Sequence, residues 1–257
     1  MGVLNVTPDS FSDGGEFTDL QRAHARALEM LAEGAALIDV GGESTRPGAA
    51  PVSVDEELRR VIPVIERLHA ASSAIVSIDT SKPEVIRAAA ATGAGMVNDV
   101  RALTVPGALE AVAQSGCAVC LMHMQGEPAT MQRAPSYRDV VAEVAAFLAE
   151  RAQACLAAGI ARERLVLDPG FGFGKTLEHN LELLRRLPEL TQTGLPLMLG
   201  VSRKSTVGAL TARGPGERLH GSLALTAIGV FQGASLIRAH DVAATVDAVK
   251  VAAAVRR

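Results

Sequence analysis

The hydrophobic positions of this chain form eight short apolar runs, each followed by polar or charged residues. The runs cover residues 2–5, 37–40, 75–78, 96–97, 118–123, 165–167, 197–200 and 236–237. Strands buried on both faces of a parallel sheet read as continuous aliphatic runs, whereas strands with one wet face alternate. The pattern therefore predicts eight buried parallel strands.

The segments between these runs have the apolar spacing of amphipathic helices. They cover residues 20–33, 54–71, 83–93, 106–115, 139–158, 177–187, 216–232 and 242–255. Ser53 is placed to cap the second helix, with Glu56 completing a capping box. Glycines stand where left-handed helix caps are expected, at Gly34, Gly93, Gly116, Gly159, Gly194 and Gly233.

Eight strands alternating with eight helices indicate an α/β fold, a (β/α)8 TIM barrel in a single domain over residues 1–257. The length of 257 residues is close to the roughly 250 typical of this barrel. A doubly wound open sheet is the alternative, and eight βα units favour closure. In a barrel the polar groups after the strands share one rim, where such enzymes hold their active sites.

Composition narrows the function. A net charge of −3 argues against nucleic-acid or membrane-surface binding, which usually requires a basic face. No apolar run approaches the roughly 18 residues of a membrane span, and no secretory signal is visible, so we expect a cytoplasmic protein. Cys117 and Cys120 form a CxxC spacing. Residues three apart on a strand point to opposite faces of the sheet, so we expect structural cysteines.

Three acceptor-rich side chains, Asp79, Asn98 and Asp168, each follow a predicted strand. Together at one rim they would suit a planar ligand that presents several N–H donors along one edge, because buried carboxylates need partners. The alternative is that the aspartates cap the following helices. The glycine-rich segment 170–176 would lie against such a ligand, with Phe173 stacking on it.

Positively charged or basic side chains also follow several strands. They are Arg46, Lys175, Arg203, Lys204, Arg238 and His240. In a mildly acidic protein this group predicts a site for an anionic substrate group, most simply a phosphate or pyrophosphate. The six histidines show no HxH or HExxH pairing, so a catalytic zinc is not expected.

The motifs resemble those of the dihydropteroate synthases, pterin-binding barrel enzymes of folate biosynthesis and the targets of sulfonamides. The resemblance runs through MGVLNVTPDSFSDGG at 1–15, GESTRPG at 42–48, SIDT at 77–80, NDV at 98–100, DPGFGFGK at 168–175, SRKS at 202–205 and RAHD at 238–241. It covers nearly the whole chain, and this ordered set is specific. Ala239 stands where the family usually has Val, a small packing change.

The resemblance implies an enzyme that joins a dihydropterin pyrophosphate to p-aminobenzoate and releases pyrophosphate. It implies pterin contacts from Asp79, Asn98, Met122, Asp168, Phe173 and Lys204. It implies pyrophosphate contacts from Asn5, Arg46, Arg238 and His240, with Mg²⁺ near Asn5. It implies a p-aminobenzoate pocket formed by Phe11, Thr45, Pro47 and Ser205, and catalytic roles for Asp79, Asp168, Lys204 and Arg238. A homodimer is implied as well.

Two other functions share part of this pattern. A pterin-dependent methyltransferase would need the pterin-contacting residues but not the pyrophosphate group Arg46, Arg238 and His240. A catalytically silent paralogue would bind pterin without forming product. Family members usually carry a further segment before the residue that matches Met1, so we expect the barrel floor to be less fully covered here.

Overall fold

Eight parallel strands form the centre of the fold, as the apolar runs predict. The computed structural model describes residues 1–7, 15–44 and 50–256, with the side chains of all of these except residues 15–18. The strands in this part of the chain are β1 (Gly2–Asn5), β2 (Leu37–Gly41), β3 (Ile75–Asp79), β4 (Met96–Asp99), β5 (Ala118–Met122), β6 (Leu165–Asp168), β7 (Met198–Leu199) and β8 (Leu236–Ile237).

The strands close into a barrel. β1 to β6 form one parallel sheet in sequence order, and β7 pairs with β8. Parallel bridges join β6 to the chain entering β7, between Leu167 and Leu197, and β1 to the chain leaving β8, between Gly2 and Ala239. Across the second junction the Val3 N–H donates to the Ala239 carbonyl at 3.0 Å. The TIM-barrel prediction is confirmed, and the open-sheet alternative is wrong.

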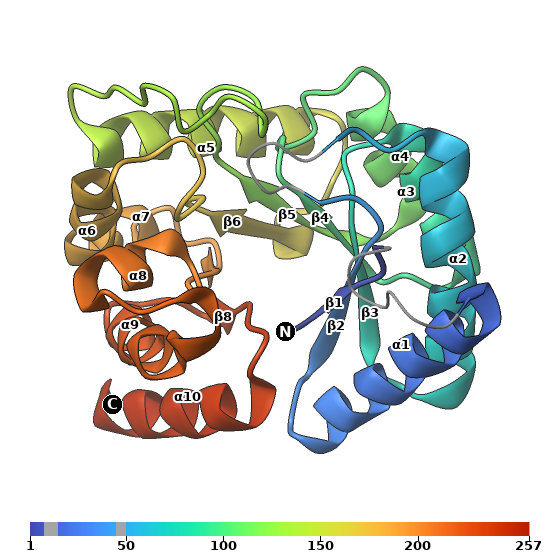
Figure 1. Ribbon diagram of the computed structural model, residues 1–257. Coiled ribbons are helices and arrows are strands. Elements are labelled where there is room, and N and C mark those ends of the chain that lie inside the picture. Colours follow the sequence, from blue (N-terminus) through green and yellow to red (C-terminus); the bar gives the residue numbers. More distant parts are fainter. Residues whose placement is uncertain (8–14, 45–49, 257) are drawn as a thin grey trace.

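Helices surround the strands (Figure 1). The described residues form α1 (Gly15–Ala32), α2 (Val54–Ala71), α3 (Pro83–Thr92), α4 (Ala108–Ser115), α5 (Val140–Ala157), α6 (Leu177–Arg185), α7 (Leu187–Thr191), α8 (Ser205–Thr211), α9 (Leu219–Phe231) and α10 (Val242–Arg256). The predicted helix 177–187 is interrupted at Arg186, whose φ and ψ are −105° and 18°. α8 was not predicted, and the first residues of predicted helix 216–232 instead belong to a 3₁₀ turn, Pro215–Glu217.

The predicted helix ends are largely confirmed. The Ser53 hydroxyl accepts from the Glu56 N–H at 3.3 Å, as an N-cap should. The second half of the predicted capping box is wrong, because the Glu56 carboxylate pairs with Arg59 and Arg60 on its own helix. All six glycines expected at helix ends have positive φ.

The core has two parts. A small cluster around Met96, Cys120 and Met198 is separate from the large cluster that contains Cys117 and joins strands to helices. Cys117 and Cys120 therefore belong to different clusters, and both are buried free thiols. The prediction of structural cysteines is confirmed.

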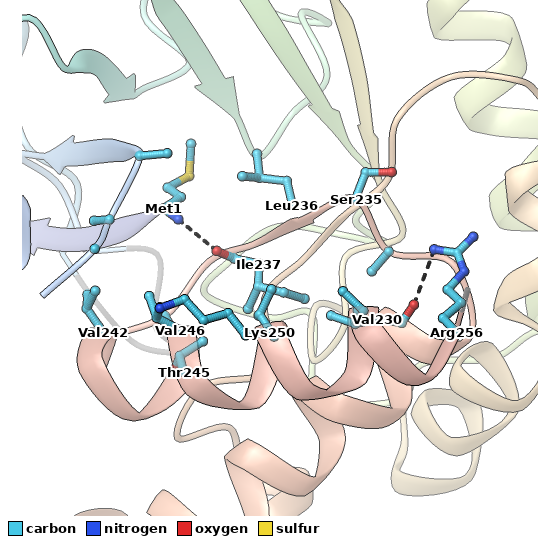
Figure 2. Close-up of a pocket in the computed structure, with 17 residues that line it drawn as sticks. Met1, Val230, Ser235, Leu236, Ile237, Val242, Thr245, Val246, Lys250 and Arg256 are labelled. Carbon is cyan, nitrogen blue, oxygen red and sulfur yellow. Dashed lines mark hydrogen bonds between the residues drawn. The ribbon is translucent and has the colours of Figure 1, made fainter.

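An apolar groove of about 560 Å³ lies where the strands begin. Figure 2 shows it between α10 and the chain around Met1 and Leu236, with Val242 and Val246 facing it from the helix. The Met1 backbone nitrogen donates to the Ile237 carbonyl at 3.0 Å beside the groove. Chemistry is expected at the other end of the barrel, where parallel strands terminate. None of the helices in the described part of the chain could cross a membrane.

Candidate active site

The strand register brings the predicted polar residues to one rim. Asn5 pairs with Gly41, Gly41 with Asp79, and Asp79 with Asn98, across β1 to β4. On β5 and β6, Met122 pairs with Asp168. These side chains thus come from the carboxyl ends of neighbouring strands, which is where a barrel builds its active site.

A cavity at this rim, the barrel-mouth cavity, is lined by most of the predicted site residues. Its polar lining comes from Asp79, Asn98, Asp168, Lys204, Arg238 and His240. Met122 and Phe173 supply apolar lining, together with Met198. The structure therefore gathers the three acceptors, three of the six expected basic residues and the two expected packing residues around one space.

The carboxylates of this cavity are largely withdrawn from water. Burial, opposed by the Arg238 guanidinium and reinforced by the negative charge of Asp39, raises the pKa of Asp79 to about 7. Burial also raises the pKa of Asp168, whose Oδ1 accepts from the Gly170 N–H at 2.7 Å. Asp168 thus orders its own loop as well as lining the cavity. Buried acceptors of this kind favour a ligand that brings N–H donors or positive charge.

Arg238 links two of the buried carboxylates. Its Nε donates to Asp39 Oδ2 at 2.6 Å, and its Nη2 donates to Asp79 Oδ2 at 2.7 Å. A guanidinium has five N–H donors, so these two bonds leave donors for an anion. Arg238 can therefore hold Asp79 in place and bind an oxyanion with the rest of its fork.

Lys204 and His240 complete the charged side of the cavity. Lys204 Nζ donates to the Phe171 carbonyl at 2.9 Å and lies 4.0 Å from the centre of the Phe173 ring. Burial lowers the pKa of Lys204 to about 8. The His240 ring nitrogen Nδ1 lies 3.1 Å from Ser202 Oγ, which fixes the ring at the rim.

Two residues of the expected cationic group point elsewhere. Arg203 Nε donates to Asp241 Oδ2 at 2.9 Å on the exposed surface. Lys175 is 3% exposed and lies inside the loop that follows β6. The structure does not bring these two side chains into the lining of the barrel-mouth cavity, because each bonds to protein partners elsewhere.

Lys175 instead ties together the glycine-rich loop. Its Nζ donates to the carbonyls of Gly170 and Phe173, each at 3.0 Å, and lies 3.0 Å from His123 Nδ1. The loop needs this close packing, since Gly170 has a φ of 68° and a Cβ there would meet the His123 carbonyl at 1.8 Å. Lys175 therefore sets the position of Phe173.

Replacing Lys175 by Met should destabilise the protein. Loss of the ammonium leaves the Phe173 carbonyl without this donor, whereas the Gly170 carbonyl keeps its bond from the Phe173 N–H at 3.0 Å. One unpaired buried group costs about 1–3 kcal/mol, so we expect urea denaturation to show a loss of about that size, with Arg185→Met on the surface of α6 as a control that stays close to the parent protein. An unchanged unfolding midpoint would contradict the role of Lys175.

Other predicted residues lie at the edge of the cavity or outside the described residues. Asn5 ends β1 and is half-buried, and Ser205 is exposed at the start of α8, directly after Lys204. Phe11, Thr45, Arg46 and Pro47 fall in segments 8–14 and 45–49, outside the described residues.

Sequence reasoning missed Asp39 and Ser202. Asp39 is a fully buried carboxylate on β2 that bonds to both Arg238 and Asn98. The available signal was a charged residue inside the apolar run 37–40. Ser202 lines the cavity and contacts His240, but a serine in a polar loop gives no comparable signal.

The rim also offers oxygen ligands for a hard cation. No group of three His, Cys, Asp or Glu residues suited to a metal occurs among the residues that the structure describes. Asn5 ends β1 at this rim and carries an amide oxygen, whereas Asp79 Oδ2 already accepts from Arg238 Nη2 at 2.7 Å. Magnesium is commonly held by one or two protein oxygens together with substrate phosphates, and the donor chemistry of Asn5 fits such an ion.

The fold and the site together define a barrel enzyme that binds a planar, donor-bearing ring with an attached anionic group. The chain belongs to the family of pterin-binding enzymes, whose model, described as "Pterin binding enzyme", matches residues 1–240. Its similarity extends over nearly the full length of individual family members.

Among these relatives are dihydropteroate synthases. The chain is 59% identical to the dihydropteroate synthase of Escherichia coli K12, over 98% of this chain and 89% of that protein. It resembles the Yersinia pestis dihydropteroate synthase, solved as a sulfonamide drug complex, with a TM-score of 0.95 and 53% identity over 100% and 93% of the two chains. The Xanthomonas albilineans enzyme, solved with 7,8-dihydropteroate, gives a TM-score of 0.91 and 53% identity over 100% and 92%.

Proposed function

We propose that this protein is a transferase that condenses 6-hydroxymethyl-7,8-dihydropterin pyrophosphate with p-aminobenzoate to give 7,8-dihydropteroate and pyrophosphate. The observation that carries the proposal is one cavity that combines buried acceptors with Arg238, Lys204 and His240, in a chain 59% identical to a dihydropteroate synthase. The acceptors match the donor edge of a pterin, and the cations match the pyrophosphate.

The pterin lies in the barrel-mouth cavity in this proposal. Its donor edge meets Asp79, Asn98 and Asp168, whose oxygens line the cavity. Lys204 donates to an acceptor on the ring, while Met122 and Phe173 pack against the ring faces. This is the deeper half of the site, and it uses side chains from β3, β4, β5 and β6 and from the loops that follow β6 and β7.

The pyrophosphate lies toward the rim. Arg238 uses two of its five N–H donors for carboxylates of the described residues, and His240 lies close by. Asn5 and Arg46 complete the proposed anion site. Mg²⁺ held near Asn5 would neutralise charge on the leaving pyrophosphate.

The p-aminobenzoate pocket is proposed from Ser205 and from residues outside the described segments. Ser205 is exposed beside Lys204, so a second substrate can reach this side of the cavity. Phe11, Thr45 and Pro47 are proposed to line the same pocket.

The reaction follows from the charges. The C–O bond to pyrophosphate breaks first, which leaves a cation at the exocyclic methylene of the pterin. Asp79 and Asp168, buried beside the ring, stabilise that cation, and Arg238 and His240 stabilise the departing anion. The arylamine nitrogen then forms the C–N bond and loses one proton.

The direct test is an assay with both substrates. The purified protein is incubated with dihydropterin pyrophosphate, p-aminobenzoate and Mg²⁺, and pyrophosphate and dihydropteroate are followed together. Equal formation of both products supports the proposal, and omission of Mg²⁺ should abolish turnover. Pterin binding with neither product would instead identify a silent pterin-binding protein.

The pH dependence should report the two shifted groups. Burial raises the pKa of Asp79 to about 7 and lowers the pKa of Lys204 to about 8. Asp79 stabilises the cation only when ionised, so kcat/KM for the pterin should fall as pH drops below 7. The charged Lys204 ammonium has one more N–H donor than the neutral amine, so kcat/KM should also fall as the pH rises above 8. A profile measured from pH 5.5 to 9 that stays flat below 7 would contradict the role of Asp79.

We further propose a homodimer in the cytoplasm. Large apolar side chains are exposed on three neighbouring helices, at Leu210 on α8, Ile228 and Phe231 on α9, and Val251 and Val255 on α10. Such a surface is typical of an interface. Light scattering should give twice the mass of the chain, and Phe231→Ser should shift the population toward monomer.

Buried free thiols at all three cysteines suit a reducing compartment.

A further inference from the structure

Asp39 is a buried charge that the proposed reaction leaves without a role. Its side chain is 0% exposed. In the register of β1 to β3 it lies opposite Val3 and Ser77, two residues before Gly41, which pairs with Asp79. Asp39 is therefore one layer deeper in the barrel than the strand ends. A carboxylate in such a place is costly unless its neighbours compensate it, so its partners indicate what it does.

The partners of Asp39 are two residues of the barrel-mouth cavity. Asp39 Oδ2 accepts from Arg238 Nε at 2.6 Å and from Asn98 Nδ2 at 3.0 Å. A guanidinium can only donate hydrogen bonds, so Asp39 Oδ2 acts here as an acceptor. The group of Asn98 that faces Asp39 must consequently be the amide nitrogen and not the amide oxygen.

This bond determines which atom Asn98 has left for a ligand. The amide oxygen Oδ1 is on the other branch of the side chain, is buried, and has no hydrogen-bond partner among the described residues. Asn98 also lines the barrel-mouth cavity beside Asp79 and Asp168. A buried acceptor without a donor is unfavourable in the free protein, and a ligand that supplies an N–H there relieves the cost.

We propose that Asp39 is a positioning residue that fixes the Asn98 amide with its oxygen available to the pterin, and so selects ligands with a donor at that point. Arg238 in turn holds Asp39 Oδ2 in place. The inference rests on the proposed function, which assigns the cavity to a pterin. Without Asp39 the amide can turn over, and its NH₂ group then meets the donor edge of the ring. Binding and selectivity are lost together, although Asp39 itself does not line the cavity.

The test is a double-mutant cycle read by ligand binding. The probe is 6-hydroxymethyl-7,8-dihydropterin without phosphate, titrated calorimetrically, so that the anion-binding role of Arg238 does not enter. We expect Asp39→Ala and Asn98→Ala each to weaken binding at least tenfold. Because Asp39 acts through Asn98, the double variant should bind within threefold of Asn98→Ala. Asp39→Ala binding within threefold of the parent, or two effects that multiply, would overturn the proposal.

A neighbouring buried residue provides the matched control. Ser77 pairs with Asp39 in the sheet, is 0% exposed, and its hydroxyl has no partner among the described residues. Ser77→Ala should bind the pterin within twofold of the parent protein. A loss of pterin affinity as large as that of Asp39→Ala would mean that any change in this layer disturbs the cavity. That result would contradict a specific role for Asp39.

A structure of the parent protein with the bound dihydropterin keeps the proposal testable if Asp39→Ala does not fold. The Asn98 amide atom nearest the ligand should face a ring N–H, and the other amide atom should contact Asp39. A ring acceptor at that place would overturn the inference. A parent protein that does not bind the dihydropterin would refute the proposed function, whereas binding that is indifferent to Asp39 refutes the positioning role alone.

Discussion

Replacing Arg238 by Met is expected to abolish turnover and to lower the free energy of unfolding by about 3–5 kcal/mol, the cost of breaking a buried ion pair from one side. Arg238 donates to Asp39 at 2.6 Å and to Asp79 at 2.7 Å, so its removal leaves two buried carboxylates without their shared cation. The pKa of Asp79 would also rise further, because Arg238 opposes the effect of burial on that group. Asp79 would then be protonated at neutral pH and unable to stabilise a cation.

Urea denaturation and steady-state turnover of the same preparation measure both effects. Arg203→Met is the matched control, since Arg203 also forms two hydrogen bonds with one carboxylate but lies on the exposed surface with Asp241. Exposed pairs are worth about 0–1 kcal/mol, so this variant should lose little stability. Equal losses in the free energy of unfolding from the two substitutions would show that the buried ion pairs of Arg238 stabilise the protein no more than an exposed pair.

The barrel was predictable because its signals are repeated and local. Each strand is an aliphatic run, and six helix-to-strand returns have a glycine whose observed φ is positive, such as Gly93 at 115° and Gly233 at 119°. The return from α2 to β3, residues 72–74, has no glycine. The errors occur where that signal is short. Ser205–Thr211 is too brief to show helical spacing, and the break at Arg186 between α6 and α7 depends on local backbone angles.

The site was predictable in its composition and less so in its contacts. A residue at a strand end is placed at the rim by the fold itself, which is why Asp79, Asn98 and Asp168 come together. Side-chain direction is a different matter. Lys175 belongs to a matching motif but turns inward to three loop acceptors, because loop packing fixes its position. The contacts of Asp39 could not be predicted from the sequence, because its partners Asn98 and Arg238 are distant from it along the chain.

Replacing Asp79 by Asn should lower kcat by about 10²–10³-fold, the usual cost of removing one group that stabilises charge in a transition state. The shape of the side chain is kept, and the Asn oxygen can still accept from Arg238 Nη2, which now lies 2.7 Å from Asp79 Oδ2. What is lost is the negative charge beside the proposed pterin cation. Because the ground-state pterin is neutral at its ring, its binding should weaken much less than turnover.

Single-turnover kinetics with the bound pterin pyrophosphate separate these two quantities. The variant should also lose the acid limb of its pH profile, because the group whose pKa burial raises to about 7 is gone. Asp99→Asn is the comparison. Asp99 is also buried and is one residue beyond Asn98, but its oxygens accept from Ser81 and from the Arg101 and Leu103 N–H groups, each of the latter at 2.8 Å. We expect it to lose stability while keeping turnover within a few-fold below its unfolding temperature. If Asp79→Asn instead matched the parent in kcat, the charge of Asp79 would not act on the reacting carbon, and the cation would have to be stabilised by Asp168 alone.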